Sequence, residues 1–213
     1  MIRRKKKNKV FCIGSGKTGT TSVEKALSDF RYKMGDQIKA ELLLNEYANR
    51  NFKAIIDFCK TADAFQDAPF CFQHTYIALD QYFKNSKFIL TVRDSDDHWY
   101  SSLINFHAKT ITEGNRLPTW EDLKNSPYRY RGYRADVRKK VFGIQEDENP
   151  YDETKLKTYY NTHNASVQDY FKNRDNLLVL NVAHNNAYKM LCSFLNETML
   201  YETFPWENKT SLK

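Results

Sequence analysis

The segment Gly14-Ser15-Gly16-Lys17-Thr18-Gly19-Thr20-Thr21-Ser22 lies between two apolar patterns near the start of this chain. The run before it, Val10-Phe11-Cys12-Ile13, is typical of a buried strand. After it, apolar residues recur with the spacing of one helix face, at Val23, Ala26, Leu27 and Phe30. We therefore expect a strand, a tight turn and a helix in direct succession.

This turn has the composition of a phosphate or sulfate cradle. Backbone N–H groups at the start of a helix attract anions, and the helix dipole adds to the attraction. Glycines let the backbone approach a ligand closely, while Lys17 and the threonine hydroxyls add donors. The turn is not the usual nucleoside triphosphate loop, because GxxxxGK[ST] would require glycine where Phe11 stands. A turn that binds nothing is the simpler alternative.

A second candidate site follows another buried strand, Phe88-Ile89-Leu90-Thr91-Val92. Arg93 comes at its carboxyl end, where open α/β sheets bind ligands. Residues 95–108 are predicted to be helical, with a cap and acidic first turn at Ser95, Asp96 and Asp97 and a packed face at Trp99, Leu103 and Phe106.

Arg93 and Ser101 are candidates for one phosphate site. Ser101 is eight residues beyond Arg93, about two helical turns along, so a guanidinium fork and a hydroxyl can meet at one anion. The alternative is that Arg93 forms an ordinary ion pair with Asp94 or Asp97.

Together the two sites resemble the sulfotransferase family, which transfers a sulfuryl group from 3′-phosphoadenosine 5′-phosphosulfate (PAPS). Lys17-Thr18-Gly19-Thr20-Thr21 is similar to the family's 5′-phosphosulfate loop, and Arg93 and Ser101 to its 3′-phosphate pair. The segments Met190–Leu195 and Phe204–Lys209 resemble two late motifs of the family. The resemblance extends over nearly the whole chain, from residue 9 to residue 210.

The resemblance implies a three-layer α/β fold, with a central, mainly parallel sheet flanked by helices and a P-loop-like strand-turn-helix at the N-terminus. It implies that PAPS is bound by Gly16, Lys17, Thr18, Gly19, Thr20, Thr21 and Ser22, together with Arg93 and Ser101. The Arg-Lys-Gly tripeptide that closes over the 3′-phosphate in cytosolic members is absent. Lys209, or one of Arg129, Arg131 and Arg134, is the candidate substitute.

The expected reaction is in-line sulfuryl transfer to a hydroxyl or amine, with 3′-phosphoadenosine 5′-phosphate (PAP) as the product and no metal requirement. Lys17 and the amides of residues 18–21 are expected to stabilise the charge on the leaving phosphate. His74 is the first candidate for the general base, because it precedes Arg93 by 19 residues, near the position of the catalytic histidine in cytosolic members. Asp67 is the carboxylate alternative.

Composition narrows the class of protein. Six of the seven units of net positive charge come from residues 3–9, so we expect a basic tail over residues 1–8 and a single domain over 9–213 that does not bind nucleic acid. No apolar run is long enough to span a bilayer. Cys12, Cys59, Cys71 and Cys192 have no metal-ligand spacing, which favours a cytoplasmic protein without a metal site.

The sequence also allows other functions. A Mg²⁺-dependent nucleotide kinase or hydrolase, or an inactive nucleotide-binding relative, are the alternative functions; the acceptor is a small molecule or glycan that the sequence does not identify.

Two helices are expected over residues 36–62, a short strand over 69–72, and helices over 77–83 and 153–173. The Arg- and Tyr-rich segment 128–134 is a solvated loop, a lid over the nucleotide, or a surface for an anionic acceptor.

Overall fold

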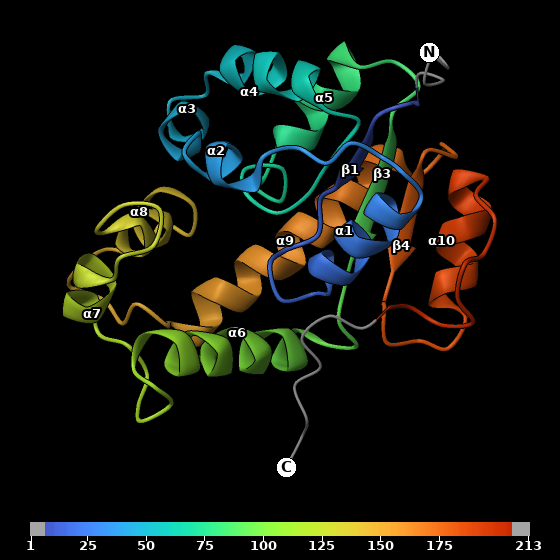
Figure 1. The fold of residues 1–213 in the computed structure, drawn as a ribbon. Coiled ribbons are helices and arrows are strands. Elements are labelled where there is room, and N and C mark those ends of the chain that lie inside the picture. Colours follow the sequence, from blue (N-terminus) through green and yellow to red (C-terminus); the bar gives the residue numbers. More distant parts are fainter. Residues whose placement is uncertain (1–6, 206–213) are drawn as a thin grey trace.

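A parallel sheet forms the centre of the computed structural model, which describes residues 7–205 (Figure 1). Its four strands are β1 (Val10–Cys12), β2 (Ala64–Phe65), β3 (Lys87–Thr91) and β4 (Leu177–Leu180). Their order across the sheet is β2-β1-β3-β4, and each adjacent pair is parallel. The predicted α/β architecture, including the strand-turn-helix at the N-terminus, is confirmed.

Ten α-helices and one 3₁₀ helix occur in the described residues. They are α1 (Thr20–Asp29), α2 (Gln37–Glu41), α3 (Leu44–Ala48), α4 (Phe52–Phe58), the 3₁₀ helix (Cys59–Thr61), α5 (Thr75–Tyr82), α6 (Asp96–Ile111), α7 (Trp120–Asn125), α8 (Tyr133–Lys140), α9 (Glu153–Phe171) and α10 (Ala187–Leu195).

Helices cover both faces of the sheet, and successive side chains of each strand point to opposite faces. Val10 and Cys12 pack with α1 and α10 on one face. Phe11 and Ile13 pack with α4, α5 and α9 on the other, where the Phe11 ring lies 5.5 Å from the rings of both Phe65 and Phe88. This arrangement of three layers explains why β1 is apolar throughout.

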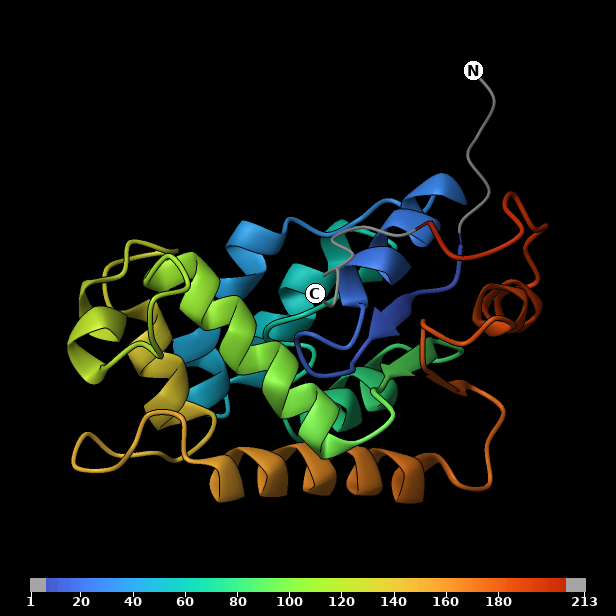
Figure 2. The same ribbon diagram turned by 90° about the horizontal axis from the view of Figure 1, so that it is seen from below.

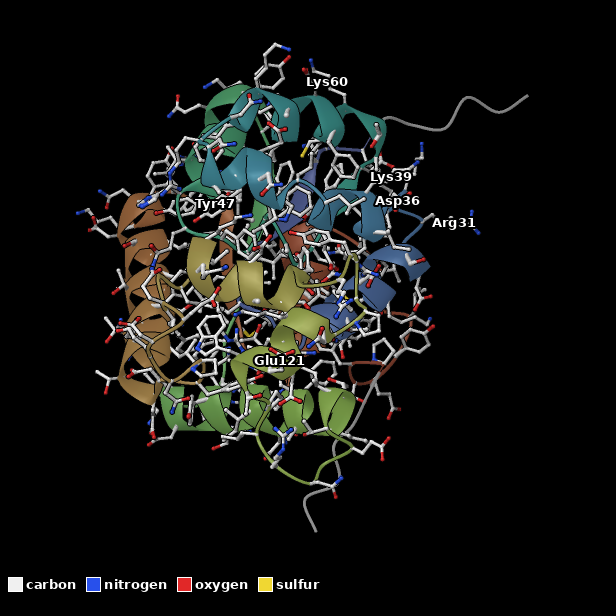
Figure 3. The ribbon with its side chains drawn as sticks, turned by 90° about the vertical axis from the view of Figure 1, so that its left-hand side faces the viewer. Arg31, Asp36, Lys39, Tyr47, Lys60 and Glu121 are labelled. Carbon is white, nitrogen blue, oxygen red and sulfur yellow. The ribbon has the colours of Figure 1, made fainter. Side chains whose placement is uncertain are left out.

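The helices furthest from α10 are α7 and α8, which lie at the opposite end of the molecule (Figures 1 and 2). The long helices α6 and α9 pack against each other, and the rings of Trp99 and Tyr160 stack between them with centres 4.6 Å apart. Seen from the side in Figure 3, α8 lies between the layer of α2–α4 and helix α6. Helix α8 thus lies near the C-terminal end of α6, away from the sheet, where Arg138 of α8 bonds to His107 of α6.

Three sequence expectations were wrong in detail. Residues 36–62 form three short α-helices rather than two, with Arg50 in a left-handed conformation (φ 57°) between α3 and α4. Residues 69–72 form a turn, because Asp67 is also left-handed (φ 60°) and its carbonyl accepts a hydrogen bond from the Cys71 amide. Residues 112–134, which have little apolar periodicity and are therefore expected to form a long loop, contain α7, which begins with a capping box between Thr119 and Asp122.

Candidate functional site

The glycine-rich loop, residues 14–19, connects β1 to α1 and lies on Thr91 at the end of β3. A Cβ atom on Gly14 would be 2.1 Å from the Thr91 hydroxyl oxygen, so only glycine fits there. Gly19 has φ 99° and is the residue before α1, a conformation that side chains rarely adopt. Gly14 therefore allows the backbone of the loop to pack directly against Thr91 of β3.

The loop offers unpaired amide donors. Within residues 7–205, the backbone N–H groups of residues 17–21 form no hydrogen bond, and no side chain caps α1. The first amides used by the helix itself are those of Ser22 and Val23, which donate to the Gly19 carbonyl. Such orphan donors at a helix N-terminus are the usual elements of an anion site.

The hydroxyls of the loop divide into internal and outward-facing groups. Thr18 is fully buried, and its hydroxyl is 2.6 Å from the Ser15 carbonyl oxygen and 2.5 Å from the Thr91 hydroxyl. Thr20 and Ser22 are also buried, whereas Thr21 is exposed. Thr18 therefore has only its amide left for a ligand, and its side chain holds the loop on the sheet.

Lys17 carries a positive charge without a carboxylate partner among the described residues. Its Nζ atom lies 3.1 Å from the centre of the Phe106 ring, a cation–π contact. Burial lowers the pKa of the Lys17 ammonium, and the carboxylate of Asp67 opposes this shift. The Lys17 ammonium is therefore available to pair with an anion bound at the loop.

Arg93 lies directly beneath the loop. Its Nε atom donates a hydrogen bond of 2.8 Å to the Lys17 carbonyl oxygen, while its two terminal amino groups have no partner in the part of the chain that the structure describes. The alternative ion pairs are not formed: the carboxylate of Asp94 is bonded to Asn181 and His184, and that of Asp97 pairs with Lys157. The Arg93 fork is thus open.

The predicted helix after Arg93 is confirmed as α6. Ser95 caps it by accepting a hydrogen bond from the His98 amide, and Ser101 lies on it with an exposed side chain and no hydrogen bond within residues 7–205. Trp99 extends beneath the loop, where its Nε1 atom donates to the Gly16 carbonyl oxygen at 2.9 Å. Helix α6 therefore fixes the loop from below while it presents Ser101 to solvent.

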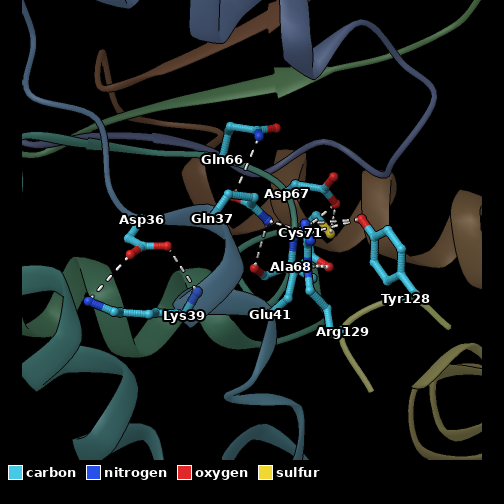
Figure 4. A network of polar contacts seen from close by, with 10 residues as sticks. All are labelled: Asp36, Gln37, Lys39, Glu41, Gln66, Asp67, Ala68, Cys71, Tyr128 and Arg129. Atoms are coloured by element: carbon cyan, nitrogen blue, oxygen red, sulfur yellow. Dashed lines mark hydrogen bonds and ion pairs between the residues drawn. The ribbon is translucent and has the colours of Figure 1, made fainter. Parts of the chain in front are cut away.

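Asp67 lies beside the loop, in the cavity described below. Its Oδ1 atom accepts hydrogen bonds from the Ala68 amide at 2.9 Å and the Cys71 thiol at 3.7 Å, and its Oδ2 atom has no partner among residues 7–205 (Figure 4). Burial raises the pKa of Asp67, with a smaller contribution from the Glu41 carboxylate, while Lys17 opposes the shift. A carboxylate with a raised pKa and a free oxygen is suited to accept a proton.

The other two predicted residues are not in this group. His74 is exposed at the start of α5, in a left-handed conformation (φ 68°), and does not line the cavity. Lys209 lies outside the described residues. The structure therefore brings together Lys17, Asp67 and Arg93 from the sequence predictions, but not His74.

A cavity of about 180 Å³ extends from the glycine-rich loop to α8. Lys17 of the loop and Asp67 line it, as do Arg134 and Arg138 of α8, and we call the part lined by these two arginines the α8 end. The rest of the wall is largely apolar and includes Phe72, Leu103, Phe106, Tyr133, Val137 and Phe142. A mainly apolar cavity with a few polar groups is the usual form of a small-molecule site.

The model of one protein family, described as a sulfotransferase domain, matches residues 9–212. The chain belongs to the sulfotransferase family. No curated protein matches it. The fold, the loop and the Arg93 helix of this sulfotransferase agree with the resemblance seen in its sequence motifs.

Two kinds of feature are absent from the described residues of this sulfotransferase, namely membrane-spanning helices and clusters of metal ligands. None of the helices within residues 7–205 is both long and apolar enough to traverse a bilayer. The same residues contain no group of three or more His, Cys, Asp or Glu side chains arranged to hold a metal ion. All four cysteines are reduced and buried.

Several cavity residues of this sulfotransferase carry no sequence signal of their own, namely Glu41, His107 and Arg138. They come from α2, α6 and α8, and only the tertiary fold brings them together. The Arg- and Tyr-rich segment contributes Tyr128, Tyr133 and Arg134 to the cavity wall, and its Arg129 donates two hydrogen bonds to the buried carboxylate of Glu41, at 2.8 and 2.9 Å (Figure 4). Its high density of arginine and tyrosine was the only sequence sign that the segment has a role.

Proposed function

We propose that this sulfotransferase transfers a sulfuryl group from PAPS to a hydroxyl or amine of a small acceptor held in the cavity. The observation that carries the proposal is the hydrogen bond from Arg93 Nε to the Lys17 carbonyl oxygen, which joins the open Arg93 fork to the loop that holds the Lys17 charge and the free amides of residues 17–21. These groups fit a ligand with anionic groups at two positions.

The residues would hold the donor as follows. Lys17 and the amides of residues 17–21 receive the 5′-phosphosulfate, and the Arg93 amino groups and the Ser101 hydroxyl receive the 3′-phosphate. When bound, PAPS supplies the sulfuryl group and leaves as PAP. Lys17 and the amides stabilise the negative charge that grows on the leaving phosphate, so the proposed reaction requires no metal ion.

Asp67 is the proposed general base. Its Oδ2 atom takes the proton of the acceptor hydroxyl as the acceptor oxygen forms the new O–S bond and the S–O bond to the 5′-phosphate breaks. The hydrogen bonds from Ala68 and Cys71 to Oδ1 keep the carboxyl group oriented. His107, which also lines the cavity, is not assigned this role, because its Nδ1 atom already accepts a hydrogen bond from Arg138 at 2.9 Å.

Two measurements on the full chain test the proposal. Isothermal titration with PAP is run with EDTA and again with Mg²⁺, with Mg·ATP as the competing ligand. Transfer from ³⁵S-labelled PAPS is then measured on a panel of phenols, alcohols and amines. Metal-independent PAP binding with labelled product is the expected result.

Other outcomes would replace the proposal by one of its alternatives. Binding of Mg·ATP but not of PAP would indicate a kinase or hydrolase. PAP binding without transfer to any class of acceptor would indicate an inactive relative.

A further inference from the structure

Arg138 of α8 is a buried cation without an anionic partner. Its side chain is 2% exposed and lines the cavity. Its Nη2 atom donates to His107 Nδ1 at 2.9 Å, and its Cζ atom lies 4.7 Å from the centre of the Tyr151 ring. Within residues 7–205, no carboxylate pairs with it and its buried Nε atom has no hydrogen bond.

Such an arrangement is costly unless an anion completes it. A guanidinium does not lose its proton in proteins, so Arg138 cannot escape burial by becoming neutral. Buried charges are therefore normally paired, and an unpaired one destabilises the fold. The missing partner of Arg138 is best supplied from the cavity that its side chain lines.

Neighbouring groups add donors and positive charge to the same end of the cavity. Arg134, one helical turn before Arg138, bonds to the Ser126 hydroxyl and has no carboxylate partner in the described chain. The acidic residues that line the cavity are Glu41, whose two oxygens are already bonded to Arg129, and Asp67 beside the loop, and neither forms an ion pair with Arg134 or Arg138 in the described chain. The positive charge at the α8 end is therefore not compensated by the protein.

His107 is also a donor rather than a counter-ion. Arg138 can only donate, so the Nδ1 atom of His107 must accept, and the proton of the neutral ring is on Nε2. Burial lowers the pKa of His107 well below its ordinary value, and the charge of Arg138 adds to this effect. The ring is therefore neutral at physiological pH.

The α8 end is separate from the proposed 3′-phosphate site. Ser101 and His107 lie on the same helix, and six residues of helix correspond to about 9 Å along its axis. Arg138 is bonded to His107, at the end of α6 away from Arg93. An anion at Arg138 is thus not the phosphate bound by Arg93 and Ser101.

We propose that the acceptor of this sulfotransferase is a largely apolar hydroxyl compound that carries a carboxylate, and that Arg138 binds this carboxylate at the α8 end of the cavity. The proposal rests on the proposed function for the identity of the reaction. The apolar walls receive the body of the acceptor, and the hydroxyl is then directed toward Asp67. Arg138 thereby selects acidic over neutral acceptors.

The test compares acids with their uncharged esters. The probes are 4-hydroxybenzoate, 4-hydroxyphenylacetate and 3-(4-hydroxyphenyl)propanoate, each with its methyl ester, titrated into the full chain with and without PAP. We expect at least one acid to bind about tenfold or more tightly than its ester, as charge-assisted hydrogen bonds allow. Arg138→Met should reduce this preference to near unity, Arg138→Lys should keep part of it, and the exposed control Arg116→Met should keep all of it.

Two results would overturn the proposal: wild-type protein that binds no acid more tightly than its ester, or an acid preference that survives in folded Arg138→Met. If that variant does not fold, the wild-type comparison and Arg138→Lys still decide. Failure of the proposed function is a different result, since binding is measured without transfer. If the chain binds acids preferentially but does not use PAPS, the inference about Arg138 stands and the proposed reaction is wrong. If sulfuryl transfer to acids and to esters is equal, the proposed reaction stands and the inference about Arg138 is wrong.

Discussion

The Nε atom of Arg93 donates a 2.8 Å hydrogen bond to the carbonyl oxygen of Lys17, which joins two motifs that are 76 residues apart in the sequence. Lys17 has a left-handed backbone conformation, with φ 72°. The bond from Arg93 therefore supports the conformation of the loop while its two amino groups stay available. One arginine connects the shape of the loop with the proposed recognition of the nucleotide.

Removal of Arg93 should weaken PAP binding more than removal of an ordinary surface arginine. Arg93→Ala is expected to raise the Kd for PAP by about tenfold to a hundredfold, because it removes charge-assisted hydrogen bonds and the support of Lys17. Arg93→Lys should recover little, since lysine lacks the fork that contacts both groups. Isothermal titration measures both, with Arg116→Ala, an exposed arginine paired with Asp122, as the matched control. Unchanged PAP affinity in Arg93→Ala would contradict the assigned role.

Lys17→Ala should lower the rate of sulfuryl transfer by about a hundredfold or more, as loss of one preorganised donor to a developing charge typically does. The fold should persist, because the ammonium has no carboxylate partner in the described residues and lies against the Phe106 ring at the cavity. Initial rates with saturating PAPS give the effect, and circular dichroism checks the fold. Lys53→Ala, an exposed lysine on α4 that pairs with Asp57, is the matched control. A Lys17→Ala enzyme with the wild-type rate would remove Lys17 from the mechanism.

Asp67 should determine the acidic limb of the pH–rate profile. As a base it must be deprotonated, so activity is present above its pKa and is lost as the pH falls through it. Because burial raises that pKa, the limb should lie above the ordinary range of an aspartate. Asp67→Asn should lower kcat/KM by about a hundredfold or more and abolish this limb.

The matched comparison for Asp67 is His74→Ala, which changes the histidine that lies outside the cavity. We expect its profile to follow that of the wild type. If instead the limb disappears in His74→Ala and persists in Asp67→Asn, histidine is the base. The profile of kcat/KM against pH for both variants decides between the two.

Local patterns predicted the loop, the Arg93 strand and helices α6 and α9, because strand and helix periodicity and caps act over a few residues. The cavity depends instead on tertiary contacts. Phe106 was expected in a packed face, yet it is 39% exposed and contacts Lys17, because it lines the cavity together with residues of α8. Arg138 has the same sequence signature as an exposed lysine or arginine; only its burial distinguishes it.

The same limit applied to residues 67–74. Spacing from Arg93 favoured His74 over Asp67 as the base, but spacing does not reveal which residue of a turn lines the cavity. Both residues have a left-handed backbone conformation, but Asp67 lines the cavity whereas His74 is exposed.

Substitution by alanine should affect stability very differently at two glycines of the loop. At Gly14 a Cβ would be 2.1 Å from the Thr91 hydroxyl and 2.4 Å from the Thr91 carbonyl oxygen, so backbone must shift. We expect Gly14→Ala to lower the free energy of unfolding by about 3 kcal/mol or more, at the upper end for overpacked sites. At Gly16, where φ is not positive, the nearest atom would be Asp67 Oδ1 at 3.8 Å, so Gly16→Ala should change stability by less than about 1 kcal/mol. Urea unfolding of both variants measures the difference, and equal midpoints would show that the loop does not rest on β3 as described.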